Sequence, residues 1–236
     1  MKDGLTVRVD ALLTGRATPY TRPGSFSGID KHACSGAVHI GALGLAGDEQ
    51  GDPRVHGGPD KAVHHYAFEH YVRWQEELGP IPLLQAAGAF GENISTHGLD
   101  EDAVCIGDQF TLGGVLLEVS QGRQPCWKLN DRFNVPDMAR RVQSTGRTGW
   151  YYRVLQAGTA TAGDMLELSS RAHPDWTLRR LNALLFGRVL DPEALEPALL
   201  LPLVPSWRKL VERRLQQCEV EDWGRRLDGP LAAESP

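Results

Sequence analysis

Residues 115–130 of this chain, VLLEVSQGRQPCWKLN, join the features of a β-strand to those of a helix. The apolar run 115–120 predicts a strand, and Pro125 biases the residue before it toward extended geometry. The pattern beyond Trp127 is helical. We therefore expect Cys126 at a strand-to-helix corner, close to a helix N-terminus.

The Cys126 thiol has two possible roles at such a corner. Arg123, Lys128 and the end of the helix would stabilise a thiolate, which is the reactive and metal-binding form of cysteine. A lone cysteine is also explained as a small buried hydrophobic residue. The local sequence leaves both interpretations open, so the rest of the chain must decide between them.

The composition is that of an ordinary globular protein. The chain has 236 residues, of which 41% are hydrophobic and 23% charged, enough for one large core or a core with a small appendage. A net charge of -5 gives no general basic field, which argues against nucleic acid as a partner. No stretch approaches the roughly 20 apolar residues of a transmembrane helix, so no membrane partner is expected.

The cysteines and the N-terminal residues predict a cytoplasmic location. The four cysteines are scattered and include no CxxC pair, which is typical of free thiols in a reducing compartment. The first residues, MKDG, lack the apolar core of a signal peptide. We therefore expect a cytoplasmic protein with unpaired cysteines.

Short segments with β-like alternation or composition recur before residue 172. Gly, Pro and Asp turn signals separate them, which favours a β-barrel or sandwich over alternating βαβ units. We predict a mainly β fold with some α structure, a mostly antiparallel barrel with peripheral helices at 68–78 and 136–143. The expected strands are 6–9, 37–40, 91–95, 109–112, 115–120, 150–155 and 165–168.

The pattern changes after Arg171. Helical periodicity predicts three helices, at 176–186, 192–200 and 207–217, separated by Gly187 and the proline-containing stretch 202–205. We therefore predict two parts, a β-barrel domain over residues 1–172 and a small helical region over residues 173–236. The apolar residues of these helices need a surface to cover, so the helices should pack on the barrel or on another chain as an accessory region.

A glycine-rich stretch at 55–63 is a candidate anion site. The adjacent Gly57 and Gly58 would let backbone N–H groups approach a phosphate or oxyanion, and Arg54 and Lys61 supply positive charge. The sequence Gly-Gly-Pro-Asp is also an ordinary tight turn. Both interpretations remain open at this point.

Two further turns carry polar side chains. Asn93, in the FGEN stretch 90–93, could donate hydrogen bonds to a ligand or merely close a turn. The stretch 144–150 holds two glycines, hydroxyl groups including Thr148, and an arginine, and turn chemistry explains it adequately. Taken together with the cysteine corner, these turns resemble one pocket assembled from loops at the rim of a barrel.

An ordered series of motifs resembles the MOSC domain family, in particular its YiiM-like branch. The resemblance covers nearly the whole chain, because YiiM-like proteins also carry a short C-terminal region of three helices followed by a motif like the last one below. The motifs are LAGDE at 45–49, HGGPDKA at 56–62, FGEN at 90–93, GD at 107–108, SQGRQPCWKL at 120–129, TGW at 148–150 and EDWGRRL at 221–227.

The resemblance implies a β-barrel that binds molybdenum cofactor (Mo-molybdopterin), with Cys126 as the protein ligand of molybdenum and the catalytic residue. A thiolate suits this soft-ligand role. The family as a whole is also associated with pyridoxal phosphate binding. The candidates for the cofactor pocket are His56, Gly57, Gly58, Lys61, Asn93, Arg123, Asn130 and Thr148.

The activity that the resemblance implies is two-electron reduction of N-hydroxylated compounds, such as 6-N-hydroxylaminopurine, which would serve detoxification. The cofactor would perform the reduction, and an external electron donor, a flavin-dependent reductase or a ferredoxin-like protein, would restore it. Trp127 or Trp150 could provide a stacking face for a planar substrate, and both are equally good core residues.

Two rival functions remain. MOSC domains are also found joined to cysteine-desulfurase-like modules, so Cys126 could carry a persulfide as a sulfur carrier. No pyridoxal-phosphate module is recognisable in this chain, which favours a stand-alone reductase. The other rival is a non-enzymatic binding module that uses its helical region as a docking surface. The sequence does not predict the oligomeric state.

Overall fold

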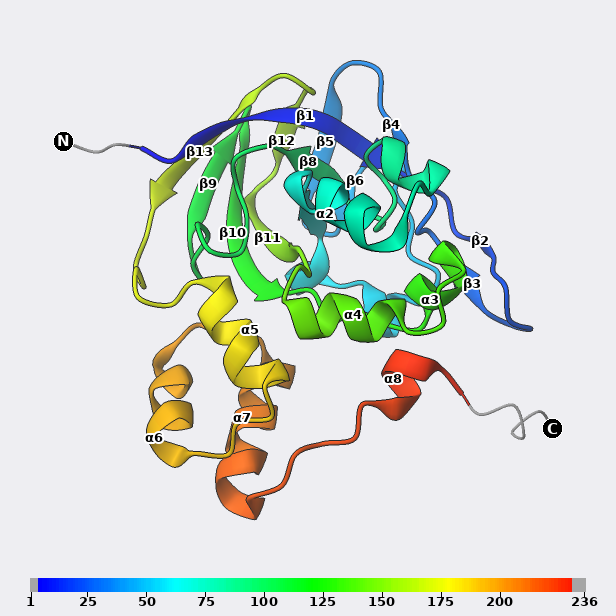
Figure 1. Ribbon diagram of the computed structural model, residues 1–236. Helices are drawn as coiled ribbons and strands as arrows, with labels where there is room; N and C mark the ends of the chain where they lie inside the picture. Colours follow the sequence, from blue (N-terminus) through cyan, green and yellow to red (C-terminus); the bar gives the residue numbers. More distant parts are fainter. Residues whose placement is uncertain (1–3, 231–236) are drawn as a thin grey trace.

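A closed β-barrel is the centre of the computed structural model, which describes residues 4–230 (Figure 1). One sheet has the strand order β13-β9-β10-β11-β7-β8-β1-β4, and the pairing of β13 with β1 closes seven of these strands into the barrel. The strands are β1 (Thr6–Thr14), β4 (His32–Ala33), β7 (Val63–Ala67), β8 (Ile94–Thr96), β9 (Gln109–Leu112), β10 (Val115–Gly122), β11 (Trp150–Gln156) and β13 (Met165–Ser170).

The barrel is mostly antiparallel, as predicted. Only β7 and β8 pair in parallel among the neighbouring strands of the barrel in residues 4–230. The sequence did not predict β7, although each of its five residues is buried. A strand buried on both faces shows no polar alternation, and the adjacent His64 and His65 hide its apolar character.

Two small sheets complete the β structure. One has the order β12-β5-β6, from Gly158–Ala160, Val38–Gly41 and Gly44–Leu45, and the other joins β2 (Thr18–Pro19) to β3 (Phe26–Ser27). Strands of two residues are too short to show a periodicity in the sequence. The β3 segment matters for function because it brings Ser27 to the cavity described below.

Short helices surround the barrel. The predicted helices are present as α2 (Glu69–Leu78) and α4 (Met138–Thr145), each shifted by one or two residues at its start. Three further short helices lie in or next to the sequence motifs: α1 (Pro53–His56), η1 (Pro59–Lys61) and α3 (Lys128–Phe133). The short helix η2 (Pro82–Gln85) follows α2. An apolar cluster that includes Tyr66, Trp74 and Phe90 packs with residues of α3 and α4 on the outside of the barrel.

Three helical segments follow the barrel, as predicted. They are α5 (Leu178–Phe186), α6 (Pro192–Leu195) continued by η3 (Glu196–Leu200), and α7 (Pro205–Gln217), and they share an apolar cluster of their own. A further short helix, α8 (Gly224–Asp228), lies apart from them and packs against α4 (Figure 1). Within residues 4–230, no helix has both the length and the apolar character that crossing a membrane requires.

A buried histidine inside the barrel should make the fold sensitive to acid. His65 Nδ1 lies 3.0 Å from the Tyr152 hydroxyl, and its Nε2 lies 2.9 Å from Thr96 Oγ1. Burial lowers the pKa of His65 to about 3, whereas an unfolded histidine has a pKa of about 6.5. Between these values the unfolded chain holds a proton that the folded chain lacks. Stability that is present above pH 6.5 is therefore lost as the pH falls toward 3.

We expect this one histidine to lower the free energy of unfolding by up to about 1.4 kcal/mol for each pH unit below 6.5. Urea unfolding at several pH values between 7.5 and 5 measures the effect. His65→Gln keeps a donor and an acceptor but cannot titrate, so stability should depend less steeply on pH in this variant. Equal pH slopes for wild type and variant would contradict the prediction.

Candidate functional site

A cavity lined by 18 residues opens beside the Cys126 corner. Segments from six parts of the chain form its wall. The ionisable side chains that line it are Lys31, Asp48, Glu49, His56, Lys61, His64, Arg123, Cys126, Lys128 and Tyr151.

Cys126 lies at a strand-to-helix corner, as the sequence predicted. The strand β10 ends at Gly122 and α3 begins at Lys128. The Arg123 backbone N–H donates to the Gly149 carbonyl at 2.9 Å, which fixes the start of the corner. Gly149 adopts a φ of +69°, and a Cβ there would lie 2.4 Å from the His65 carbonyl oxygen, so glycine is required. The corner thus places the half-buried thiol in the wall of the cavity.

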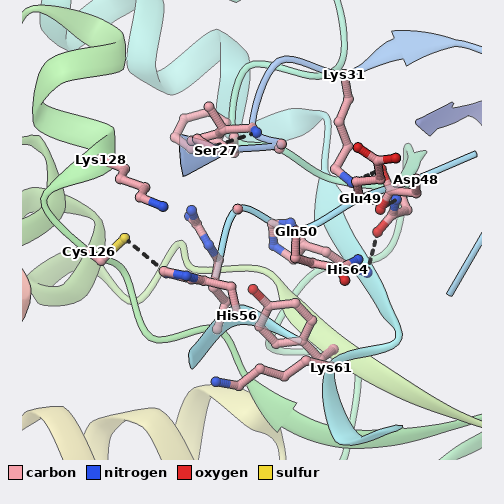
Figure 2. Close-up of a pocket in the computed structure, with 18 residues that line it drawn as sticks. Ser27, Lys31, Asp48, Glu49, Gln50, His56, Lys61, His64, Cys126 and Lys128 are labelled. Atoms are coloured by element: carbon pink, nitrogen blue, oxygen red, sulfur yellow. Dashed lines mark hydrogen bonds and ion pairs between the residues drawn. The ribbon is translucent and has the colours of Figure 1, made fainter. Parts of the chain in front are cut away.

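The fold brings the His56 imidazole beside the Cys126 thiol. Its Nε2 lies 3.6 Å from Cys126 Sγ, although 70 positions separate the two residues (Figure 2). Burial lowers the pKa of His56 to about 4, and the cations of Lys128 and Lys61 act in the same direction. His56 is therefore neutral near pH 7, and its buried Nδ1 has no hydrogen-bond partner in the described residues.

Positive charge gathers on the same side of the cavity. Arg123 is 7% exposed, and its Nη1 is buried without a hydrogen-bond partner in the described part of the chain. Such a donor is costly to leave unpaired, which makes it a candidate contact for an accepting ligand. Lys61 Nζ donates to the Val55 carbonyl at 2.5 Å, and Lys128 Nζ donates to the Phe26 carbonyl at 2.6 Å. Both ammonium groups keep further donors for a ligand.

The opposite wall holds a buried ion pair that the sequence did not predict. Lys31 Nζ donates to both carboxylate oxygens of Asp48, and the two side chains are 6% and 2% exposed (Figure 2). Asp48 also accepts the Gly15 backbone N–H at 2.8 Å. Burial lowers the pKa of Lys31, and Asp48 opposes this shift. The pair therefore places a compensated charge at the far side of the cavity from Cys126.

Asn93 lines the cavity, but its hydrogen bonds are made within the protein. Its Oδ1 accepts the His64 backbone N–H at 3.0 Å. Its Nδ2 donates to the Leu13 carbonyl at 3.1 Å and to Asp48 Oδ2 at 2.9 Å, which uses both amide hydrogens. Asn93 therefore joins two strands and orients Asp48, and its part in cofactor binding stays a prediction.

Asn130 and Thr148, which we expected in the pocket, lie outside its lining. The Asn130 amide donates to the Leu227 carbonyl at 2.8 Å and accepts the Ala139 backbone N–H at 2.7 Å. Thr148 Oγ1 accepts from Asn182 Nδ2 at 3.1 Å, which holds α5 against the loop before β11. Both residues therefore satisfy backbone and side-chain groups behind the site.

The glycines of the predicted anion cradle shape a turn and do not line the cavity. Gly58 has a φ of +97°, a conformation that glycine adopts without strain. Its carbonyl accepts the Lys61 N–H at 3.0 Å, so the turn sets the position of the lysine. Gly57 follows α1, where a Cβ would approach the Pro53 carbonyl to 3.0 Å.

The two tryptophans proposed as stacking faces do not line the cavity either. Trp150 is buried in the barrel, with its ring 4.3 Å from that of His65. Trp127 stacks beneath the Arg22 guanidinium, which lies 4.0 Å from the centre of its ring. Phe90 and Tyr151 are the aromatic side chains of the cavity wall, and a planar ligand would contact these.

Two family models match this chain. The first, described as the MOSC domain, matches residues 52–167, and the second, described as the YiiM-like 3-alpha helix domain, matches residues 176–217. The chain is 41% identical over 217 residues to protein YiiM of Escherichia coli (strain K12), an alignment that covers 92% of this chain and 96% of YiiM. The chain belongs to the MOSC domain family. More narrowly, it is a member of the YiiM-like branch.

The solved structures agree with this assignment. The crystal structure of YiiM from Escherichia coli superposes with a TM-score of 0.80 at 35% identity, over 94% of this chain and 98% of that one. A protein of Gibberella moniliformis named reductase is 39% identical over 191 residues, which are 80% of this chain and 34% of that protein. The YiiM-like chain thus spans about a third of its reductase-named relative.

The MOSC match alone does not contain the cavity. Ser27, Lys31 and Asp48 precede residue 52, where the match begins, yet they form part of the wall. The N-terminal segment of this YiiM-like chain is therefore part of the site, together with the matched domain.

Proposed function

We propose that this protein is a molybdenum-cofactor-dependent reductase of N-hydroxylated compounds such as 6-N-hydroxylaminopurine. The observation that carries the proposal is that one cavity holds both the Cys126 thiol and the buried Nη1 of Arg123, which has no hydrogen-bond partner within residues 4–230. A cysteine thiolate is a soft metal ligand, and a buried donor without a partner is expected to bind an accepting group. Membership of the MOSC family and a reductase-named relative support the reaction class.

The residues present suit this cofactor. Cys126 would supply the protein ligand to molybdenum, while Arg123 and Lys61 would hold the phosphate of the pterin through charge-assisted hydrogen bonds. Burial lowers the pKa of Lys61, and its neighbours Cys126 and Asp60 oppose this shift. When bound, the cofactor supplies the two electrons that reduce the N–O bond.

The chain's own groups would orient the substrate and supply protons. Reduction of R–NHOH to R–NH₂ and water consumes two electrons and two protons. The Lys31 ammonium is the proton donor that we propose, because burial lowers its pKa and Asp48 holds its Nζ at the cavity wall. Phe90 and Tyr151 would exclude water from one side of a planar substrate. Neutral His56 would fix the Cys126 side chain.

The proposal is tested with protein made in a host that produces molybdenum cofactor. The molybdenum content is measured first, and the loaded protein then receives 6-N-hydroxylaminopurine with a chemical reductant or a flavin-dependent reductase. We expect adenine as the product, and an amine or amidine from a simple hydroxylamine or amidoxime. A fully loaded protein that reduces none of these compounds would instead favour the sulfur carrier, which mass spectrometry of a Cys126 persulfide would detect.

A further inference from the structure

The segment after α7 runs from the three-helix region to the back of the Cys126 corner. We call residues 219–228, which include α8, the C-terminal strap. Figure 1 shows it leaving α7 and crossing the molecule to end beside α3 and α4. It contributes no side chain to the cavity lining. Its contacts are nevertheless with the residues on either side of the cysteine.

One residue of the strap, Arg226, bonds to both neighbours of Cys126. Its Nη1 donates to the Pro125 carbonyl, and its own carbonyl accepts the Trp127 N–H at 2.8 Å. The corner lies between the end of β10 and the start of α3. Its other backbone hydrogen bonds are at its two ends, where the Arg123 N–H donates to Gly149 and the carbonyls of Cys126 and Trp127 accept from the first turn of α3. A residue one hundred positions away therefore holds the backbone that carries the thiol.

Arg226 and the residue after it are held in place by contacts with α3 and α4. Its Nη2 donates to Gln143 Oε1 at 2.6 Å, which ties the guanidinium to α4. Leu227 is buried in the apolar cluster outside the barrel, and its carbonyl accepts the Asn130 amide at 2.8 Å. These two hydrogen bonds and the buried Leu227 side chain hold the strap against α3 and α4.

The other end of the strap is tied to the three-helix region. Glu221 accepts two hydrogen bonds from the fully buried Arg214 guanidinium of α7, at 2.8 and 3.1 Å. The same carboxylate accepts the Trp223 indole N–H at 2.6 Å. Arg214 in turn donates to the Leu185 carbonyl of α5 at 2.7 Å. The strap is therefore a continuous mechanical link from the helices to the cysteine.

We infer that Arg226 is a positioning residue that fixes the Cys126 corner, and that the C-terminal helices contribute to the site through the strap. The earlier expectation that they are only accessory is replaced by this inference. It deepens the proposed function, because it rests on Cys126 as the functional thiol. It concerns the order of the corner, which can be measured without any cofactor.

The test compares Arg226→Ala and Arg226→Lys with Arg225→Ala, a matched control at an exposed arginine of the same helix. Hydrogen exchange of the unloaded, full-length protein is followed by mass spectrometry at one pH, together with the rate of Cys126 alkylation. In Arg226→Ala, amides 126–130 should exchange at least about tenfold faster, since local opening is governed by the lost contacts. The strands β1 and β13 should be unchanged.

Rescue experiments distinguish the loss of the Arg226 hydrogen bonds from a general loosening of the fold. Arg226→Lys keeps one donor for the Pro125 carbonyl and should recover part of the protection. Millimolar guanidinium should restore protection in Arg226→Ala only. Glu221→Gln, which weakens the far end of the strap, should produce the same pattern more weakly, and it serves if Arg226→Ala does not fold.

In the loaded enzyme, Arg226→Ala should lower molybdenum retention and kcat and leave KM unchanged, because the strap does not line the cavity. Unchanged exchange at residues 126–130, or equal loosening of the whole barrel, overturns the inference. The proposed function fails separately, when loaded wild-type protein does not reduce N-hydroxylated compounds.

Discussion

Cys126→Ser is expected to abolish molybdenum retention and N–O reduction while the fold stays intact. A hydroxyl is a poor replacement for a thiolate as a ligand of a soft metal. Changes to residues that only support metal ligands already cost about 10- to 100-fold, so loss of the ligand should exceed about 100-fold in turnover. The half-buried thiol belongs to none of the three apolar clusters, so thermal unfolding should change little.

The other cysteines provide controls within the same chain. Cys34 lies beside Thr14, with its sulfur 3.4 Å from the hydroxyl, and Cys218 is exposed after α7. Neither lines the cavity. Cys34→Ser and Cys218→Ser should therefore keep wild-type molybdenum content and turnover. A Cys126→Ser protein that also keeps both would contradict the ligand assignment.

The parts of the fold that the sequence predicted are those with strong local signals. Polar alternation and turn residues located most of the barrel strands, and Pro125 between an apolar run and a helical pattern located the corner. Strand β7 was not predicted, because burial on both faces removes the alternation of polar and apolar residues. α8 has five residues, too few to show a helical periodicity, and its position depends entirely on tertiary contacts.

The candidate site was predicted less completely than the fold. Cys126, His56, Lys61 and Arg123 meet at the cavity, and their roles in cofactor binding stay predictions. The sequence allowed Asn93 either to donate to a ligand or to close a turn, and its amide donates to the Leu13 carbonyl and to Asp48. Residue type alone does not say where a hydrogen bond goes, because that depends on which groups the fold buries beside it.

The Lys31–Asp48 ion pair is a part of the site that the sequence did not predict. Asp48 belongs to a motif that we quoted, but Lys31 lies in a loop with no distinguishing pattern. A lysine in such a loop is expected to be solvated, since charged side chains are rarely buried unless they are paired. The barrel rim brings the two residues together and buries both. Only the tertiary structure therefore shows that this lysine faces a cavity.

Arg123→Ala should weaken cofactor binding more than any other change to the cationic side of the cavity. The buried Nη1 is without a partner in residues 4–230, so a phosphate there would accept a charge-assisted hydrogen bond. Such a bond contributes about 1.5 to 3 kcal/mol, which corresponds to a loss of affinity of about 10- to 150-fold. Lys61→Ala should have a smaller effect, because that ammonium group is more exposed to solvent.

Cofactor occupancy at limiting cofactor measures this loss, with the free energy of unfolding of the unloaded protein measured alongside. Stability should change less than affinity, because removing a buried cation with an unpaired donor also removes a desolvation cost. Arg123→Lys keeps the charge but not the forked donor, so its occupancy should be intermediate. Arg54→Ala is the matched control, since Arg54 is exposed and paired with Asp52 outside the cavity. Equal occupancy in wild type, Arg123→Ala and Lys61→Ala would show that the cofactor phosphate binds elsewhere.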